Sequence, residues 1–217
     1  DFPDSILVNT IEVDPFTHKI YVGYQDGSGT PNGNITGIKV YNYDPLTGVV
    51  TDEGYLTTAV TDNRPNESGF FVLDPQDFAI DHSIVPGGRL FYTERVDGLA
   101  VGIYRLDLSA PNVATELVAD AQFPFDMSNG QIIDVEVDES TDLVYFTTRS
   151  QYPSPDVGYD ANDNAIWYIS SSASSGTATK VTLVGLPGGS AYYGGDMTFD
   201  QSTRQIYVES EETSGSD

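Results

Sequence analysis

The 217-residue sequence contains no cysteine, which excludes a disulfide framework, a thiolate metal site and a cysteine nucleophile. Basic residues are scarce, because nine Lys and Arg stand against 33 Asp and Glu, for a formal net charge of −24. That charge repels nucleic-acid phosphates and anionic lipid headgroups, so we expect no nucleic-acid partner and favour cations. No apolar run approaches the roughly 18 residues of a membrane span, so membrane insertion is not expected.

The sequence does contain an internal repeat. Each copy has two acids or their equivalents four residues apart, then a turn, then a segment rich in β-branched and aromatic residues. The copies are TIEVDPFTHKIYVG from Thr10, DFAIDHSIVPGGRLFYTE from Asp77, DVEVDESTDLVYFTT from Asp134 and DMTFDQSTRQIYVES from Asp196. A period of about 60 residues exceeds that of most solenoids and suits a propeller blade with long loops.

Within each repeat the pattern predicts antiparallel strands. In DVEVD the apolar Val135 and Val137 alternate with acids, which is the period of two expected of a strand. Third strands are predicted from Gly37, Gly102 and Ala165, and fourth strands from Gly54, Thr115 and Thr179. No segment has a sustained helical stripe with caps. The predicted fold class is therefore all-β, a β-propeller of four-stranded antiparallel blades over residues 1–217, with repeats near 10–76, 77–133, 134–195 and 196–217.

The segments IEVDPFTHKIYVG with GIKVYNYDPLTG, and FAIDHSIVPGGRLFYTE with GIYRLDLS, resemble blades of three propeller groups. These are the YWTD propellers of lipoprotein receptors, the NHL-repeat propellers and the gluconolactonase-like propellers. The resemblance covers nearly the whole chain and implies propeller architecture. It does not by itself imply one function.

The repeat count predicts about three and a half blades, since the fourth copy stops after two strands. The segment DSILVN, residues 4–9, could be the outer strand of a preceding blade. Either it completes the last blade and closes a small ring, or the chain is an arc of a larger propeller. We favour the arc, because single-chain propellers usually need four to eight blades. The chain also opens with neither an initiator Met nor a signal peptide, and we interpret it as a processed or excised piece. Its open blade faces would be covered by a protein partner or by missing chain.

The two acids of each repeat receive different predicted roles. The second acid starts the hairpin turn, where its side chain can hold local backbone N–H groups. The first acid, at Asp77, Asp134 and Asp196, begins an innermost strand beside the central channel, with Thr10 in the same position of the first repeat. These three carboxylates could converge on a calcium ion, or each could accept backbone N–H groups or face channel water.

Two further kinds of site are predicted in loops. Asp160, Asn162 and Asn164 have the first spacings of an EF-hand calcium loop, although Ala165 and Ser171 depart from its later positions, so a polar loop with Asx turns is the alternative. Asn34 and Asn66 lie in glycosylation sequons.

The sequence favours a secreted or cell-surface, noncatalytic propeller that acts as a binding or structural module, with calcium as a possible stabilising ion. The alternative is a metal-dependent gluconolactonase-like hydrolase. Resemblance to that family implies metal ligands just ahead of inner strands, for which Asn129 and Asp196 are the candidates. The two histidines, His18 and His82, both fall in turns and predict no zinc site or catalytic triad.

Overall fold

The computed structural model describes residues 6–26, 38–56, 75–83, 87–96, 99–109, 114–119, 130–150, 165–174, 176–182 and 195–208. These residues form strands and turns, and none of them forms a helix. Within those ranges there is accordingly no helix long and apolar enough to cross a membrane. The all-β prediction is confirmed.

Three four-stranded antiparallel sheets and one hairpin follow one another along the chain, each with its strands in sequence order. The first three sheets are β1 (Ile6–Asp14), β2 (Lys19–Asp26), β3 (Ile38–Tyr43) and β4 (Val50–Tyr55); β5 (Pro75–Asp81), β6 (Arg89–Val96), β7 (Leu99–Asp107) and β8 (Ala114–Ala119); and β9 (Gly130–Asp138), β10 (Leu143–Ser150), β11 (Ala165–Ser170) and β12 (Thr179–Lys180). The hairpin is β13 (Met197–Asp200) with β14 (Gln205–Val208). These are the predicted blades, which we call blades 1 to 3 and the fourth hairpin.

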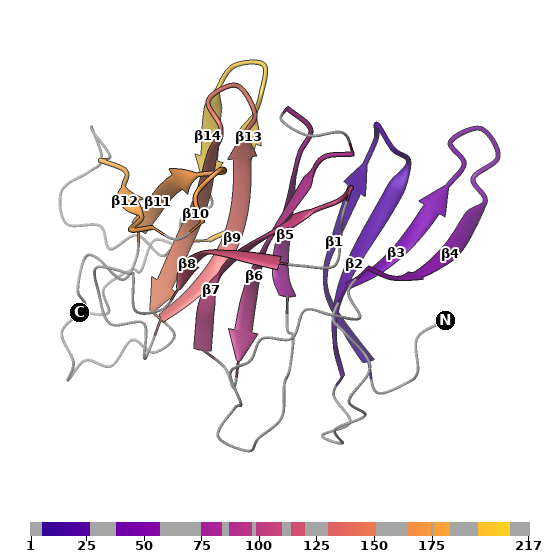
Figure 1. Ribbon diagram of the computed structural model, residues 1–217, viewed down its shortest axis with the longest axis horizontal. Helices are drawn as coiled ribbons and strands as arrows, with labels where there is room; N and C mark the ends of the chain where they lie inside the picture. The colour runs from indigo at the N-terminus through magenta and orange to yellow at the C-terminus, as the bar shows by residue number, and fades with distance from the viewer. Residues whose placement is uncertain are drawn as a thin grey trace, which may run out of the picture.

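The first strand of each blade lies beside the first strand of the next. Contacts join β1 to β5, β5 to β9 and β9 to β13, and Figure 1 shows these inner strands side by side, with β3 and β4 at one outer edge. The repeat therefore determines how the blades are arranged, in addition to forming similar hairpins. It brings the same positions of successive repeats to one line of inner strands.

Apolar cores lie between the blades because each sheet presents alternate side chains to its two neighbours. Between blades 1 and 2 the core includes Tyr21, Ile38 and Phe78, together with the fully buried Leu90 and Tyr92. A second core joins blades 2 and 3. It contains, among others, Phe91, Ile103, Val135, Val137, Val144, Phe146 and Trp167.

The hairpin turns keep a common backbone geometry. The residue just before each second strand has a positive φ: His18 at 57°, Gly88 at 85°, Asp142 at 55° and Arg204 at 57°. This left-handed conformation is unfavourable for a residue with a side chain. It occurs at a non-glycine residue in blade 1, blade 3 and the fourth hairpin, at the same position of the turn. The turn is therefore held by interactions from elsewhere, which the second acid supplies.

Two sequence predictions are wrong. Residues 6–9 do not form the outer strand of a preceding blade, because they are the first part of β1, with a bulge at Asn9 where the register shifts. Nor does the segment complete the fourth hairpin, since β13 and β14 form a sheet of their own. The fourth strand of blade 1 begins at Val50, ahead of the predicted Gly54, because a tight turn at Asp44 reverses the chain early and Gly48 N–H donates to Asp44 O (2.8 Å).

Candidate functional site

The inner strands gather four carboxylates, Glu12, Asp77, Asp134 and Glu136, which we call the inner-strand carboxylates. Glu12 and Glu136 occupy the same position of their repeats, two residues after Thr10 and Asp134. The alternation of β1, β5 and β9 turns these polar positions toward the following blade, while the apolar residues between them face the preceding one. The same pattern that builds the cores thus brings acids together.

Asp77 links three blades. Its Oδ1 accepts the hydroxyl hydrogen of Thr10 on β1 (3.2 Å), and its Oδ2 accepts the backbone N–H of Val135 on β9 (2.9 Å). Asp134 repeats the second bond, because its Oδ2 accepts the N–H of Met197 at the start of β13. In both cases the acid of one blade binds the residue that follows the equivalent acid of the next. The first acid therefore joins consecutive inner strands.

Packing acids together alters their ionisation. Burial, with the hydrogen bond and the charge of neighbouring Asp77, raises the pKa of Asp134 well above its ordinary value, so this side chain is neutral at pH 7. Burial and the charges of Asp77 and Asp14 raise the pKa of Glu12 to about 7. Burial and the charges of Asp77 and Glu12 do the same for Glu136, whose pKa is about 7. Some of the inner-strand carboxyl groups are therefore protonated at neutral pH.

The second acid of each repeat holds its turn, as predicted. Asp14 accepts the N–H groups of Phe16 (2.8 Å) and Thr17 (3.1 Å), and Asp81 accepts the N–H (2.7 Å) and hydroxyl (2.6 Å) of Ser83. Asp200 accepts the N–H of Ser202 (2.8 Å) and the hydroxyl of Thr203 (2.7 Å). An ionised carboxylate makes strong bonds of this kind, which stabilises a strained turn.

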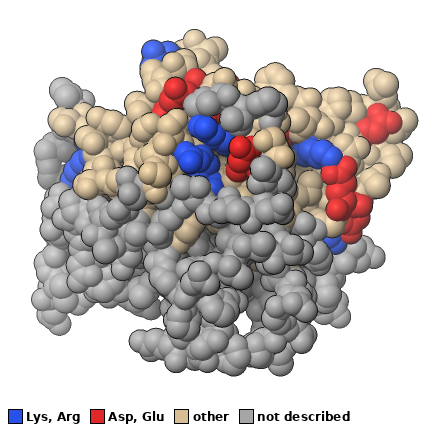
Figure 2. Space-filling model, in the orientation of Figure 1, with Lys and Arg blue, Asp and Glu red and all other residues tan. Residues whose placement is uncertain are grey.

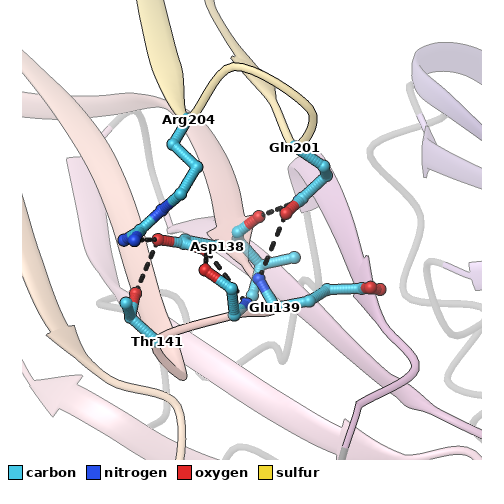
Figure 3. A network of polar contacts seen from close by, with 7 residues as sticks. Asp138, Glu139, Thr141, Gln201 and Arg204 are labelled. Carbon is cyan, nitrogen blue, oxygen red and sulfur yellow. Dashed lines mark hydrogen bonds and ion pairs between the residues drawn. The ribbon is translucent and has the colours of Figure 1, made fainter.

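Asp138 extends this arrangement across blades, as Figure 3 shows. Its Oδ2 accepts hydrogen bonds from Thr141 Oγ1 (2.6 Å) and from Arg204 Nη2 of the fourth hairpin (2.9 Å). Burial opposes ionisation, but the hydrogen bonds from Ser140, Thr141 and Arg204 outweigh it and bring the pKa of Asp138 to about 2. This buried carboxylate is therefore charged at every physiological pH.

In the second, third and fourth repeats the residue after the second acid connects the turns into a chain. His82 Nε2 lies 3.1 Å from Asp14 Oδ1, and the His82 N–H donates to Glu139 Oε1 (3.0 Å). The Glu139 N–H donates in turn to Gln201 Oε1 (3.4 Å), and Gln201 Nε2 donates to Val137 O (2.5 Å). Blades 1 to 3 and the fourth hairpin are thus joined at their turns as well as at their inner strands.

Two partly exposed surfaces lie at the ends of this series. On blade 1 the exposure lies on β1 and does not extend to β2, because Val22 and Tyr24 of β2, which pair with Ile11 and Val8, are buried. On blade 1 the apolar Val8, Ile11 and Val13 of β1 are 46%, 58% and 46% exposed. On the fourth hairpin Asp196 and Thr198 are exposed, and Tyr207 is 54% exposed. We call these the blade 1 face and the hairpin face.

Charge is unevenly spread over the described surface. On the side shown in Figure 2, acidic side chains gather near the β3–β4 end with Lys and Arg side chains beside them, and further Lys and Arg side chains lie in the middle and at the opposite end. Part of this acidity is paired within blade 1, where Lys39 Nζ lies 2.8 Å from Asp52 and Lys19 pairs with Glu53. The Lys19–Glu53 pair is partly exposed and contributes little to stability, whereas Lys39 is buried beside the exposed carboxylate of Asp52.

The structure brings some of the predicted site residues together and separates others. Asp77 and Asp134 lie together, whereas Asp196 lies on the hairpin face. Among the described residues, no three acidic or histidine side chains are grouped so that they could hold a metal, and calcium binding remains a prediction. Asp160, Asn162 and Asn164, the hydrolase candidate Asn129 and the sequon residues Asn34 and Asn66 all lie outside the described residues.

Several residues of these networks are not predicted from the sequence. The strand alternation of DVEVD includes Glu136 without assigning it a role, and Glu12 is not predicted, although the shared position of the two residues in the repeat identifies them. The turn chain of His82, Glu139 and Gln201 has no common residue type, so only its place directly after the second acid could have indicated it.

Comparison with known proteins identifies the fold. No protein-family model and no curated protein matches the chain. A crystal structure of a nidogen/laminin complex is similar, with 14% identity and a TM-score of 0.54 over 96% of this chain. The extracellular domain of a hybrid two-component system from B. thetaiotaomicron is a weaker match, with 14% identity and a TM-score of 0.46, covering 96% of this chain and 26% of that one. The present chain spans 59% of the nidogen/laminin chain that it matches. Taken with the blade order, the comparison shows that this chain has a β-propeller fold.

Proposed function

We propose that this chain is a noncatalytic β-propeller module that binds another protein outside the cell, as a secreted or cell-surface component. The observation that carries the proposal is the blade 1 face. Three apolar side chains in a row, Val8, Ile11 and Val13, are about half exposed on an otherwise strongly acidic chain. A row of exposed apolar side chains on a regular sheet is typical of a protein interaction surface.

The inner-strand carboxylates support a structural role for the acids rather than a catalytic one. Asp77 and Asp134 already accept N–H groups of the following blade, which is a use that stabilises packing. The similar nidogen structure is a complex with laminin, so a chain with this fold is known in a protein assembly. An external location agrees with the acidic composition and with the sequons at Asn34 and Asn66. Calcium binding is an additional prediction for this module.

The proposal is tested by partner capture from the extracellular fraction of the source cells, with the chain as bait. We expect Ile11→Asp to abolish capture, because a charge in the middle of an apolar interface is costly to bury. Leu46→Asp is the matched control, since Leu46 is 93% exposed in the β3–β4 turn and should tolerate the same change. Capture that is equal for both variants would contradict the proposal.

A second measurement addresses the hydrolase alternative. Purified chain, supplied with calcium, zinc or manganese, should show no turnover of lactones or phosphotriesters. Metal-dependent turnover that disappears in both Asn129→Ala and Asp196→Ala would overturn the noncatalytic proposal.

A further inference from the structure

We propose that the blade 1 face binds the hairpin face of a second copy of this chain, so that copies associate head to tail. This inference rests on the proposed function, because it names the partner of the same surface. Its basis is that the two faces are the two halves of an interface that the chain already forms between its own blades.

The first half of that interface is the apolar side of an inner strand. On β5 the residue in this position is the buried Phe78, on β9 it is Val135 with Val137, and on β13 it is Met197. In each case the side chain is covered by the preceding blade, as part of the cores described above or, for Met197, by blade 3. On β1 the same positions of the repeat are Ile11 and Val13, with Val8 on the same side, and these are exposed.

The second half is the side of a blade that faces the following one. On blade 3 it provides Asp134, which accepts the N–H of Met197, and Tyr145, whose ring stacks on Phe199 at a centroid distance of 5.8 Å. The strand register places Tyr145 opposite Glu136, and it places Tyr207 opposite Thr198 in the same way. Asp196 and Tyr207 of the hairpin face therefore repeat Asp134 and Tyr145, and both are exposed.

Superposing the repeats predicts the contacts between copies. Ile11 has the position of Met197, so its N–H should donate to Asp196 of the second copy. Val13 has the position of Phe199, so the ring of Tyr207 should pack on it. Because the two faces differ, the association is heterologous, and it forms a closed ring or an open chain according to the rotation between copies.

A second copy is the occupant that fits best, because one chain carries both halves with the residue types that its internal interfaces use. Burying Val8, Ile11 and Val13 under Tyr207 removes apolar surface from water, which is the main favourable term in association. The hairpin face adds a hydrogen-bond acceptor in the place where blade 3 has one. Exposed acids elsewhere on the chain supply a repulsion that salt should screen.

Sedimentation velocity of the full chain over a wide concentration range tests the inference. We expect reversible association that salt strengthens, with a dissociation constant about tenfold or more higher in Ile11→Asp and in Tyr207→Ala. Leu46→Asp, which adds the same charge outside both faces, should associate like the parent chain. Far-ultraviolet circular dichroism checks that each variant keeps its strand content.

Mixing the variants tests the head-to-tail geometry. An Ile11→Asp copy retains a functional hairpin face, and a Tyr207→Ala copy retains a functional blade 1 face, so their mixture should form a 1:1 dimer that neither forms alone. Monomers at all concentrations, or association that Ile11→Asp does not weaken, would overturn the inference. If monomeric chain still captures a different protein through Ile11, the second-copy inference fails while the proposed function stands.

Discussion

Asp77 Oδ2 lies 2.9 Å from the backbone nitrogen of Val135, 58 positions further along the chain and on the inner strand of the next blade. Asp134 makes the same bond to Met197, so the contact belongs to the repeat rather than to one residue. An acid at the first position of the template thus determines how neighbouring blades are aligned.

The first prediction concerns the two acids as a matched pair. Asp77→Ala leaves the Val135 N–H and the Thr10 hydroxyl without their acceptor, and we expect a loss of about 1–3 kcal/mol in the free energy of unfolding. Asp134→Asn should cost less than about 0.5 kcal/mol at pH 7, because an amide has the shape and hydrogen-bonding capacity of the neutral acid. Urea unfolding measures both. Equal losses would contradict the assigned protonation of Asp134.

The second prediction concerns pH. Glu12 and Glu136 have pKa values of about 7 in the folded chain, against 4.5 when unperturbed, so between these values the folded state holds more protons than the unfolded state. Stability should therefore fall as pH rises from about 4.5 to 7. Allowing for solvent screening, we expect these two groups together to account for a decrease of about 1–2 kcal/mol.

The groups that face Glu12 and Glu136 include Asp77, Asp14 and Thr198, and these would remain in a Glu12→Gln, Glu136→Gln double variant. That variant should lose the part of the decrease that these two protons cause, while Asp134, whose pKa is also raised, keeps its own contribution. Thermal unfolding at several pH values measures the effect. A stability profile with the same slope in the parent and the variant would show that other groups are responsible.

The third prediction concerns Asp138, whose pKa of about 2 lies below its unperturbed value of 3.8. This carboxylate contributes stability above pH 4, and the contribution is lost as pH falls toward 2. Asp138→Ala leaves Arg204 and the Ser140 and Thr141 donors without their acceptor, so we expect a loss of about 2–4 kcal/mol at pH 7. Asp200→Ala is the control, because Asp200 makes similar turn bonds at an exposed site and should cost clearly less.

The fourth prediction concerns the one blade whose turn uses glycine before the second strand. A methyl group on Gly88 would lie 2.9 Å from His82 Nδ1 and 3.0 Å from Asp81 O, at a φ of +85°. Gly88→Ala should therefore destabilise the fold by about 1–3 kcal/mol. Gly48 also has a positive φ but open space around it, so Gly48→Ala should cost only the backbone term of about 1 kcal/mol. Equal costs would argue against the close contact.

The fifth prediction concerns calcium. The proposed calcium binding predicts a higher thermal midpoint in calcium than in chelator, whereas an equal midpoint would show that Asp77 and Asp134 serve only their N–H donors. A midpoint that rises with calcium and loses the rise in Asp77→Asn would place an ion at the inner strands. A rise that survives substitution of Asp77, Asp134 and Asp196 would assign the ion to the loop of Asp160.

The repeat made the fold readable from the sequence. Four copies agree in the positions of apolar and acidic residues, so inner strands ending at Asp14, Asp81, Asp138 and Asp200 follow from alternation and turn chemistry alone. The role of the second acid could also be predicted from the sequence, because its hydrogen-bond partners lie two or three residues away. Local physics determines both features.

Features that depend on contacts between distant segments were harder to predict from the sequence. The sequence left open whether Asp77 and Asp134 bind an ion or the backbone, because the N–H donors are about 60 residues further along the chain. The start of β4 was misplaced because Asp44 and Thr47 form a turn that competes with the strand pattern that begins at Gly54. Neither result could follow without knowing which strands are neighbours.

Backbone amide hydrogen exchange tests most directly the central claim that the first acid of each repeat holds the next blade. The account predicts slow exchange at both Val135 and Met197 in the parent chain. Asp77→Ala should accelerate exchange at Val135 and leave Met197 protected, because only the first amide loses its acceptor. Unchanged protection of Val135, or an equal loss at both amides, would contradict the account.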